Sequence, residues 1–479
     1  MSWLATSLMI LTEFVLVIGL IAHVLVRKSG NSETRLAWIL MIGILPFIGA
    51  IFYLLLGAPR GTRQIRRHAR VRGCFPAMFE TRSEDLPNLE TNVPRHYRQV
   101  FSLIESLSET DAMGGHELEL LGGDSAFFER LIEDIDTATD SCHLLTYIYL
   151  DDEDGRRVAE TLMRASDRGV TCRVLVDGHG SKHFLRCETC RRMKERGVHV
   201  VEGLPSRLLT MLWARMDVRN HRKIVVVDNA IGYIGSQNIA SESFAPKARY
   251  APWVDCMVRM QGPAVHNLQE LFIEDWYLDS NEDLGKMLDE VPTIKQSETT
   301  VQIIGSGPNF RNEALSLAMQ AAINAAEQSL TLTTPYFVPD QATSVAICSA
   351  AMRGVKTTLI VPARNDSKLV ALASSAQYEA LLQAGVEIHL FEAGLLHAKT
   401  MVVDRQLFMV GSANLDRRSL ELNFEACLFG WDPNFASRLH FLQSGYLDQS
   451  SPLDESAWMQ RSTMKRLASN AAGLLAPLL

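Results

Sequence analysis

The feature that most constrains the fold is an internal repeat, because one order of strand-like and helix-like segments occurs twice in the chain. In the first copy we expect strands at 142–150, 171–176 and 198–201 and helices at 155–168 and 187–196. In the second copy we expect strands at 330–337, 357–361 and 386–391 and helices at 342–353 and 369–384. Such alternation predicts parallel strands with helices packed on the sheet. Two copies therefore predict an α/β fold of two halves in a pseudo-two-fold arrangement, with a single ligand site at their interface.

Each copy is followed by the same catalytic-looking motif, H-x-K-x4-D. Its members are His221, Lys223 and Asp228 in the first half and His397, Lys399 and Asp404 in the second. Residues i and i+2 of a strand face the same way, so each histidine and its lysine are expected on one side. Each aspartate comes at the strand end beside turn-like residues, which favours a structural or supporting role.

A Gly-Ser-x-Asn sequence follows each histidine at the same spacing, on a segment that we expect to run back along the strand. It supplies Ser236 and Asn238 in the first half and Ser412 and Asn414 in the second. Hydroxyl and amide groups offer hydrogen bonds to a ligand. A lone histidine on a strand is usually a core residue, but two identical constellations make that explanation weak.

This set of side chains suits a phosphodiester substrate. Two lysines neutralise the non-bridging oxygens, and serine and asparagine donate hydrogen bonds to them. One histidine can attack phosphorus to give a phosphohistidine, and the other can protonate the leaving oxygen. This chemistry requires neither a metal nor a cofactor, and we predict neither.

The N-terminal segment 1–58 differs from the rest of the chain. Residues 3–26 are apolar apart from Glu13 and His23, and residues 36–56 carry no charge at all. About 20 apolar residues cross a bilayer, so we expect a two-helix transmembrane hairpin. A cleaved signal peptide is the alternative for the first segment, but a basic start and a clear cleavage site are missing. Glu13 is costly in lipid unless it is protonated or paired, or unless this span lies shallow.

The orientation of the hairpin follows from arginines. Six follow the second span: Arg60, Arg63, Arg66, Arg67, Arg70 and Arg72. Such a cluster stays cytoplasmic, so we expect a multi-pass protein of the bacterial inner membrane with a cytoplasmic catalytic domain. The same arginines can attract anionic lipid headgroups, although a topology signal alone explains them equally well.

Net charge and cysteine content bear on two other kinds of protein, those that bind nucleic acid and those that bind zinc. The formal net charge of −8 argues against a protein that coats nucleic acid. Cys187 and Cys190 follow His179 and His183, a spacing that could bind zinc. A single C-x2-C is a weak signal and the second half has no counterpart, so we favour incidental thiols on a solvated helix.

The duplicated motif resembles that of the phospholipase D superfamily, whose enzymes are generally metal-independent. The resemblance implies His221 as nucleophile and His397 as general acid and base, although near symmetry leaves exchange of these roles open. It also implies an acidic residue that holds each histidine. Glu425 lies beyond His397 and fits, whereas Asp255 lies farther beyond His221 and fits only if a loop is inserted between them.

Within the superfamily the chain is most similar to bacterial cardiolipin synthases, over nearly its whole length. This resemblance implies transfer of a phosphatidyl group between two phosphatidylglycerol molecules, with glycerol released. Water or another alcohol as acceptor would instead make a phospholipase D or a different phospholipid synthase. A nuclease is a further alternative, which the membrane hairpin and the negative net charge disfavour. A catalytically silent lipid-binding protein is another, which the two intact motifs disfavour.

We therefore divide the chain into five parts. They are a transmembrane hairpin (1–58), a basic juxtamembrane connector (59–112), two phospholipase D-like halves (113–290 and 291–455) and a C-terminal amphipathic tail (456–479). In the tail, Arg461, Lys465 and Arg466 are expected to oppose Trp458, Leu467 and Leu474, a pattern that suits the membrane interface or plain packing. The sequence leaves the oligomeric state open.

Overall fold

The computed structural model describes residues 3–26, 32–54, 92–108, 110–204, 218–289, 293–307 and 313–474. The arginine cluster at 60–72 and the segment 475–479 lie outside these ranges. The chain forms two units, one of residues 1–67 with 206–218 and one of residues 68–205 with 219–479.

The described residues of the first unit form the helices α1 (Trp3–Val26), α2 (Ser32–Ile44) and α3 (Pro46–Phe52). The expected span 36–56 is thus broken, because Pro46 lacks an N–H to continue α2 and instead begins α3. Tyr53 packs against Trp38 and hydrogen-bonds the His23 ring at 2.7 Å, which ties the helices together. Among the described residues, no helix meets the length and apolarity needed to cross a membrane.

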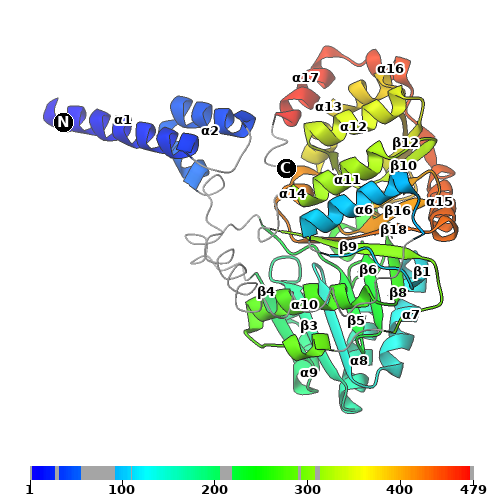
Figure 1. The fold of residues 1–479 in the computed structure, drawn as a ribbon. Helices are drawn as coiled ribbons and strands as arrows, with labels where there is room; N and C mark the ends of the chain where they lie inside the picture. Colours follow the sequence, from blue (N-terminus) through cyan, green and yellow to red (C-terminus); the bar gives the residue numbers. More distant parts are fainter. Residues whose placement is uncertain are drawn as a thin grey trace. The chain divides into compact units, whose positions relative to one another are not determined.

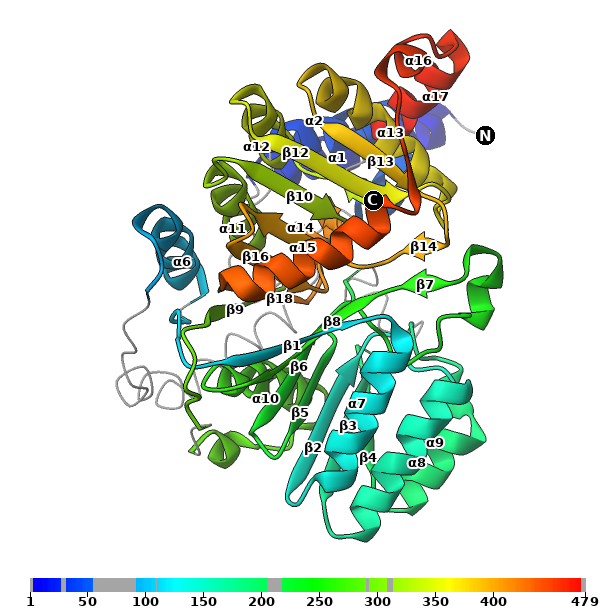
Figure 2. The same ribbon diagram turned by 90° about the vertical axis from the view of Figure 1, so that its right-hand side faces the viewer.

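The second unit is built on two large sheets (Figures 1 and 2). The described strands of the first run in the order β1-β8-β6-β5-β2-β3-β4. Their bounds are β1 Glu117–Gly122, β2 Ser141–Thr146, β3 Thr171–Asp177, β4 His199–Gly203, β5 Ile224–Val227, β6 Ile231–Gly235 and β8 Cys256–Gln261. The repeat of strands and helices gives the parallel strands β2, β3 and β4, as predicted, while β5, β6, β8 and β1 pair antiparallel.

The second sheet repeats this order as β9-β18-β16-β15-β10-β12-β13, with β19 added at its edge. Its bounds are β9 Thr300–Ser306, β10 Ser329–Thr333, β12 Lys356–Pro362, β13 Glu387–Phe391, β15 Thr400–Val403, β16 Leu407–Gly411, β18 Glu425–Trp431 and β19 Ser450–Pro452. The expected two α/β halves are therefore confirmed, as mixed rather than purely parallel sheets.

Helices cover the outer face of each sheet. On the first half these are α7 (Asp124–Thr137), α8 (Glu153–Asp167) and α9 (Glu188–Glu195). On the second they are α6 (Arg95–Ser108), α11 (Ala314–Asn324), α12 (Gln341–Met352) and α13 (Lys368–Gln383). The expected connector 59–112 thus includes a helix, α6, whose apolar face belongs to the core of the second half.

A third apolar cluster joins the halves. It includes Leu268 and Phe272 of α10 (Val265–Ser280), Phe435 and Leu439 of α15 (Pro433–Leu447), and buried side chains from both sheets. Two short parallel pairs also form beside the sheets: β7 (Trp253–Val254) with β14 (Leu395–Leu396), and β11 (Phe337–Val338) with β17 (Leu415–Asp416). The pair β7–β14 links one half to the other directly.

Candidate active site

The first histidine lies immediately before β5, in an extended segment that reaches the second half. The His221 N–H donates to the carbonyl oxygen of Phe424 at 2.8 Å. Lys223 donates to the carbonyl oxygen of His221 at 2.6 Å, and the Tyr147 ring lies 4.3 Å from the imidazole. The expected strand therefore begins at Ile224, after the histidine and lysine rather than with them.

The second histidine has the same setting with the halves exchanged. The N–H groups of His397 and Ala398 both donate to the carbonyl oxygen of Val254 in the first half. Lys399 donates to the carbonyl oxygen of His397, and the Trp253 ring lies 4.8 Å from the imidazole. Each motif is thus anchored to the backbone of the other half.

The carboxylates that hold the histidines are exchanged between the halves. His221 Nδ1 lies 3.0 Å from Glu425 Oε1, and His397 Nδ1 lies 2.6 Å from Asp255 Oδ1. The sequence identified both acids, but placed each with the histidine of its own half, and that pairing is wrong. Because an ionised carboxylate only accepts hydrogen bonds, each Nδ1 carries the proton and each Nε2 is left for chemistry.

The two serines lock these carboxylates in place. Ser236 Oγ donates to Asp255 Oδ1 and Ser412 Oγ donates to Glu425 Oε2, each at 2.5 Å. Each hydroxyl also accepts a backbone N–H at 3.0 Å, from Cys256 or Ala426. Their hydrogen bonds orient the acids, which is a supporting role, and their expected contact with a phosphate stays a prediction.

The two asparagines differ from each other. Asn238 Oδ1 accepts the N–H of Ile148 at 3.1 Å and so shapes the loop after β2. Asn414 Nδ2 donates to Ser419 Oγ at 3.2 Å, at the start of the short helix α14 (Arg417–Glu421). Its Oδ1 is buried and has no hydrogen-bond partner among the described residues.

The motif aspartates bind backbone far along the strand from the histidines. Asp228 accepts the N–H groups of Thr139, Asp140 and Ser141 at 2.8–2.9 Å. Asp404 does the same for 327–329 and also accepts the Tyr97 hydroxyl at 3.0 Å. Both therefore fix the turns that lead into β2 and β10.

Burial controls the charge of the site. It is the main reason why the pKa of His397 is lowered to about 4 and that of Lys399 to about 7. The Asp255 carboxylate raises both pKa values and the Lys223 ammonium lowers both, without reversing the effect of burial. Burial also lowers the pKa of Lys223. His221 is more open, with its side chain 23% exposed against 10% for His397. An arriving anion would favour the protonated forms of these groups.

Sequence reasoning missed Arg222, between the first histidine and lysine. Its guanidinium is fully buried, pairs with Asp275 of α10 at 2.8 Å and donates to the carbonyl oxygens of Glu425 and Ser306 in the second half. The second motif has Ala398 at this position. That difference between the two motifs was the only signal available in the sequence.

The first cysteine of the C-x2-C pair caps a helix. Cys187 Sγ accepts the N–H of Cys190 at the start of α9, and Cys190 is buried. No group of metal-ligating side chains suited to an ion occurs among the described residues.

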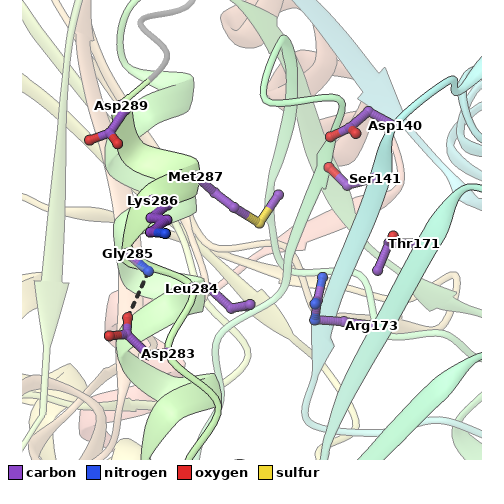
Figure 3. Close-up of a pocket in the computed structure, with 10 residues that line it drawn as sticks. All are labelled: Asp140, Ser141, Thr171, Arg173, Asp283, Leu284, Gly285, Lys286, Met287 and Asp289. Atoms are coloured by element: carbon purple, nitrogen blue, oxygen red, sulfur yellow. Dashed lines mark hydrogen bonds between the residues drawn. The ribbon is translucent and has the colours of Figure 1, made fainter.

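A cavity of about 700 Å³ lies where β2 and β3 begin (Figure 3). The register of β2 against β5 puts this at the other end of the sheet from His221. Asp140 and Ser141 line it where β2 begins, with Arg173 of β3 and Met287 nearby. None of the predicted site residues lines this cavity.

Comparison with known proteins agrees with this geometry. Residues 131–276 and 319–441 match the family described as cardiolipin synthase, PLD-like domain, and residues 15–57 match the phospholipase D-nuclease N-terminal family. The chain is 37% identical to cardiolipin synthase A of Edwardsiella ictaluri and 36% identical to that of Serratia proteamaculans, over 100% of this chain and 98% of each relative.

A solved structure shares the fold. Phosphatidylserine synthase of Haemophilus influenzae superposes with a TM-score of 0.61 at 15% identity, covering 80% of this chain and 99% of that one. The same family is indicated by the shared topology of the two sheets, by the duplicated motif and by the full-length relatives. The chain belongs to the family of cardiolipin synthases with phospholipase D-like domains.

Proposed function

We propose that this protein makes cardiolipin by transferring a phosphatidyl group from one phosphatidylglycerol to another, with release of glycerol. The observation that carries this proposal is that each histidine is oriented by a carboxylate of the opposite half. This exchange brings both histidines into one shared site. The full-length similarity to relatives named cardiolipin synthase A supports the choice of reaction.

In the first step we assign His221 as the nucleophile. Its Nε2 attacks phosphorus while Nδ1–H remains bound to Glu425, which stabilises the positive charge that develops on the ring. The bond from phosphorus to the glycerol oxygen breaks, and His397 Nε2–H protonates that oxygen. Lys223 and Lys399 face the negative oxygens of the phosphoryl group.

In the second step the proton moves in the opposite direction. His397, now neutral, accepts a proton from the hydroxyl of the second phosphatidylglycerol, whose oxygen attacks phosphorus. The phosphorus–nitrogen bond breaks and His221 is restored. A pKa of about 4 keeps His397 neutral in the free site, and the phosphodiester charge favours the protonated form needed for the first step.

Water must be kept from the intermediate, since its attack would give phosphatidic acid. The Tyr147 and Trp253 rings lie against the two imidazoles, and both lysines are buried. These apolar surfaces favour a lipid hydroxyl over water. A phospholipase D, or a transferase using another alcohol, remains the second candidate because the same site would serve it.

We also propose that residues 1–58 form the transmembrane hairpin of a multi-pass protein of the bacterial inner membrane, and that the arginines at 60–72, within the connector 59–112, lie on the cytoplasmic side beside anionic lipid. The apolar sequences of 3–26 and 36–56, the match over 15–57 and the arginines at 60–72 support this. The halves 113–290 and 291–455 and the tail 456–479 complete the proposed division.

The test uses the full chain purified in detergent, with phosphatidylglycerol as the only lipid and EDTA present. We expect cardiolipin and glycerol in equal amounts, and loss of both products in the His221→Ala and His397→Ala variants. Phosphatidic acid instead of cardiolipin would mean that water is the acceptor. Near-normal turnover by either variant would refute the assigned site.

A further inference from the structure

The C-terminal helix exposes its large apolar residues to solvent and buries its small residues, which is unusual for a helix that only packs against protein. The helix α17 (Thr463–Gly473) follows α16 (Glu455–Met459) and buries the small residues Ser469 and Ala472. Met464, Leu467 and Leu474 recur at helical spacing on the opposite side and are 73%, 61% and 82% exposed. An amphipathic helix in water normally shows the reverse pattern.

The small residues face the neighbouring helix α13. Ser469 pairs with Ser375 of α13 at 2.8 Å, and Ala472 packs with Ala373 in a small buried cluster. Arg466 binds Glu379 at 3.1 Å, so the two helices run antiparallel, side by side in Figures 1 and 2. The expected opposition of basic residues to Trp458 is wrong, because Trp458 packs between Tyr378 and Arg461.

The exposed apolar residues are concentrated on these two helices. Of the nine large apolar side chains exposed in the described residues of the second unit, five lie on α13 or at α17: Leu369, Leu372, Met464, Leu467 and Leu474. Exposed Lys368 begins α13 beside Leu369 and Leu372, and the chain continues after Leu474 as Leu-Ala-Pro-Leu-Leu. We call these five residues the apolar face.

This face is connected to the active site through a few contacts. Ala472 and Ala373 pack on Val338 of β11, and β11 pairs with β17, directly after Asn414. Asp366, two residues before α13, accepts the Tyr336 hydroxyl at 2.7 Å and pairs with Lys247 of the first half. The apolar face therefore begins beside the segments that position the catalytic side chains.

We propose that the apolar face docks on an anionic phospholipid bilayer and delivers lipid to the site. The inference rests on the proposed function, because substrates that stay in a bilayer must be reached from its surface. Exposed apolar residues gathered on neighbouring helices mark such contacts, and the exposed Lys368 complements the negative headgroups. Apolar side chains would enter the headgroup boundary while α13 holds α17 through its small residues.

The test compares Met464→Gln/Leu467→Gln with a matched control, Phe441→Gln, which removes an apolar side chain 81% exposed on α15. The full chain is reconstituted in vesicles of phosphatidylglycerol and phosphatidylcholine. We expect the double variant to raise the KM for vesicle phosphatidylglycerol roughly tenfold, with no change for monomeric dihexanoyl phosphatidylglycerol. The control variant should change neither value.

A second measurement locates the face directly. A fluorophore is attached to the Leu467→Cys variant, and the unaltered chain treated with the same fluorophore is the reference. Spin-labelled lipid should quench the fluorophore at position 467, and it should not quench one attached to the Phe441→Cys variant. Quenching of position 467 by aqueous iodide would overturn the proposal. Shielding from both quenchers would also overturn it, since a protein segment or second copy would then cover the face. Absence of turnover with either substrate in the unaltered chain would instead refute the proposed function.

Discussion

At the level of single residues, the two motifs differ although their key letters are the same. His221 is the more open histidine and lies beside Tyr147, whereas His397 is enclosed beside Trp253. The sequence predicted the histidines and lysines of the site because the duplicated motif is recognisable by its spacing, whereas Asp255 and Glu425 followed only from the resemblance to a known family. It did not predict burial, so the lowered pKa of Lys399 had no sequence signal.

Asp228 tests the structural role of the motif aspartates. Although burial opposes it, hydrogen bonds from 139–141 lower the pKa of this carboxyl. Its contribution to stability is therefore present above the unfolded pKa of about 4 and is lost as pH falls through the folded value. We expect Asp228→Asn to destabilise the protein by about 1 kcal/mol at neutral pH, because the site is partly exposed and screened.

The comparison is made by chemical unfolding at pH 7 and pH 3.5. Asn tolerates the positive φ of 50° at position 228, so the substitution changes charge without straining the backbone. The difference from the unaltered chain should shrink at the lower pH. Asp448→Asn, an exposed carboxyl, serves as the control, and an equal effect at both pH values would contradict the assignment.

At the level of elements, β5 and β18 bring the two halves into one site. The parallel strands of each half followed from its repeat, and the return of β6 along β5 and of β16 along β15 was also predicted. The exchange of Asp255 and Glu425 was not, because distance along the chain does not say which half a strand end faces. Arg222 shows this best, since its partners lie in α10 and in the second half.

Arg222→Met should damage both stability and catalysis. Removing the guanidinium leaves the buried Asp275 carboxylate without its cation, with only the hydrogen bond from Asn220 among the described residues, and breaking a buried ion pair in this way costs about 3–5 kcal/mol. It also frees the backbone of Glu425, the residue that orients His221. We expect a lower Tm and a lower kcat in the protein that remains folded.

Arg259→Met is the matched control. Arg259 binds Asp134 at 2.6 Å, within the first half. This variant should lose stability while its folded fraction keeps a normal kcat. An equal loss of kcat in both variants would show that Arg222 acts only through general stability.

At the level of the whole molecule, the duplication explains why one chain holds a complete site. Each sheet supplies a histidine, a lysine and a carboxylate, and the exchange of carboxylates makes neither half sufficient alone. The sequence predicted two halves and one shared site. It also predicted one unbroken second span at 36–56, where Pro46 instead begins a new helix. The tail was predicted as amphipathic, but which face is buried depended on α13.

The most direct test asks where the phosphatidyl group is held between the two steps. A phosphatidyl donor with p-nitrophenol as leaving group needs no protonation, so the His397→Ala variant should still complete the first step. We predict a burst of about one equivalent of nitrophenolate per protein. Mass spectrometry of protein that is quenched without acid should then find a phosphatidyl group on His221. The His221→Ala variant should give neither. A burst in His221→Ala with the group on His397, or turnover of the unaltered protein without any covalent adduct, would contradict this account.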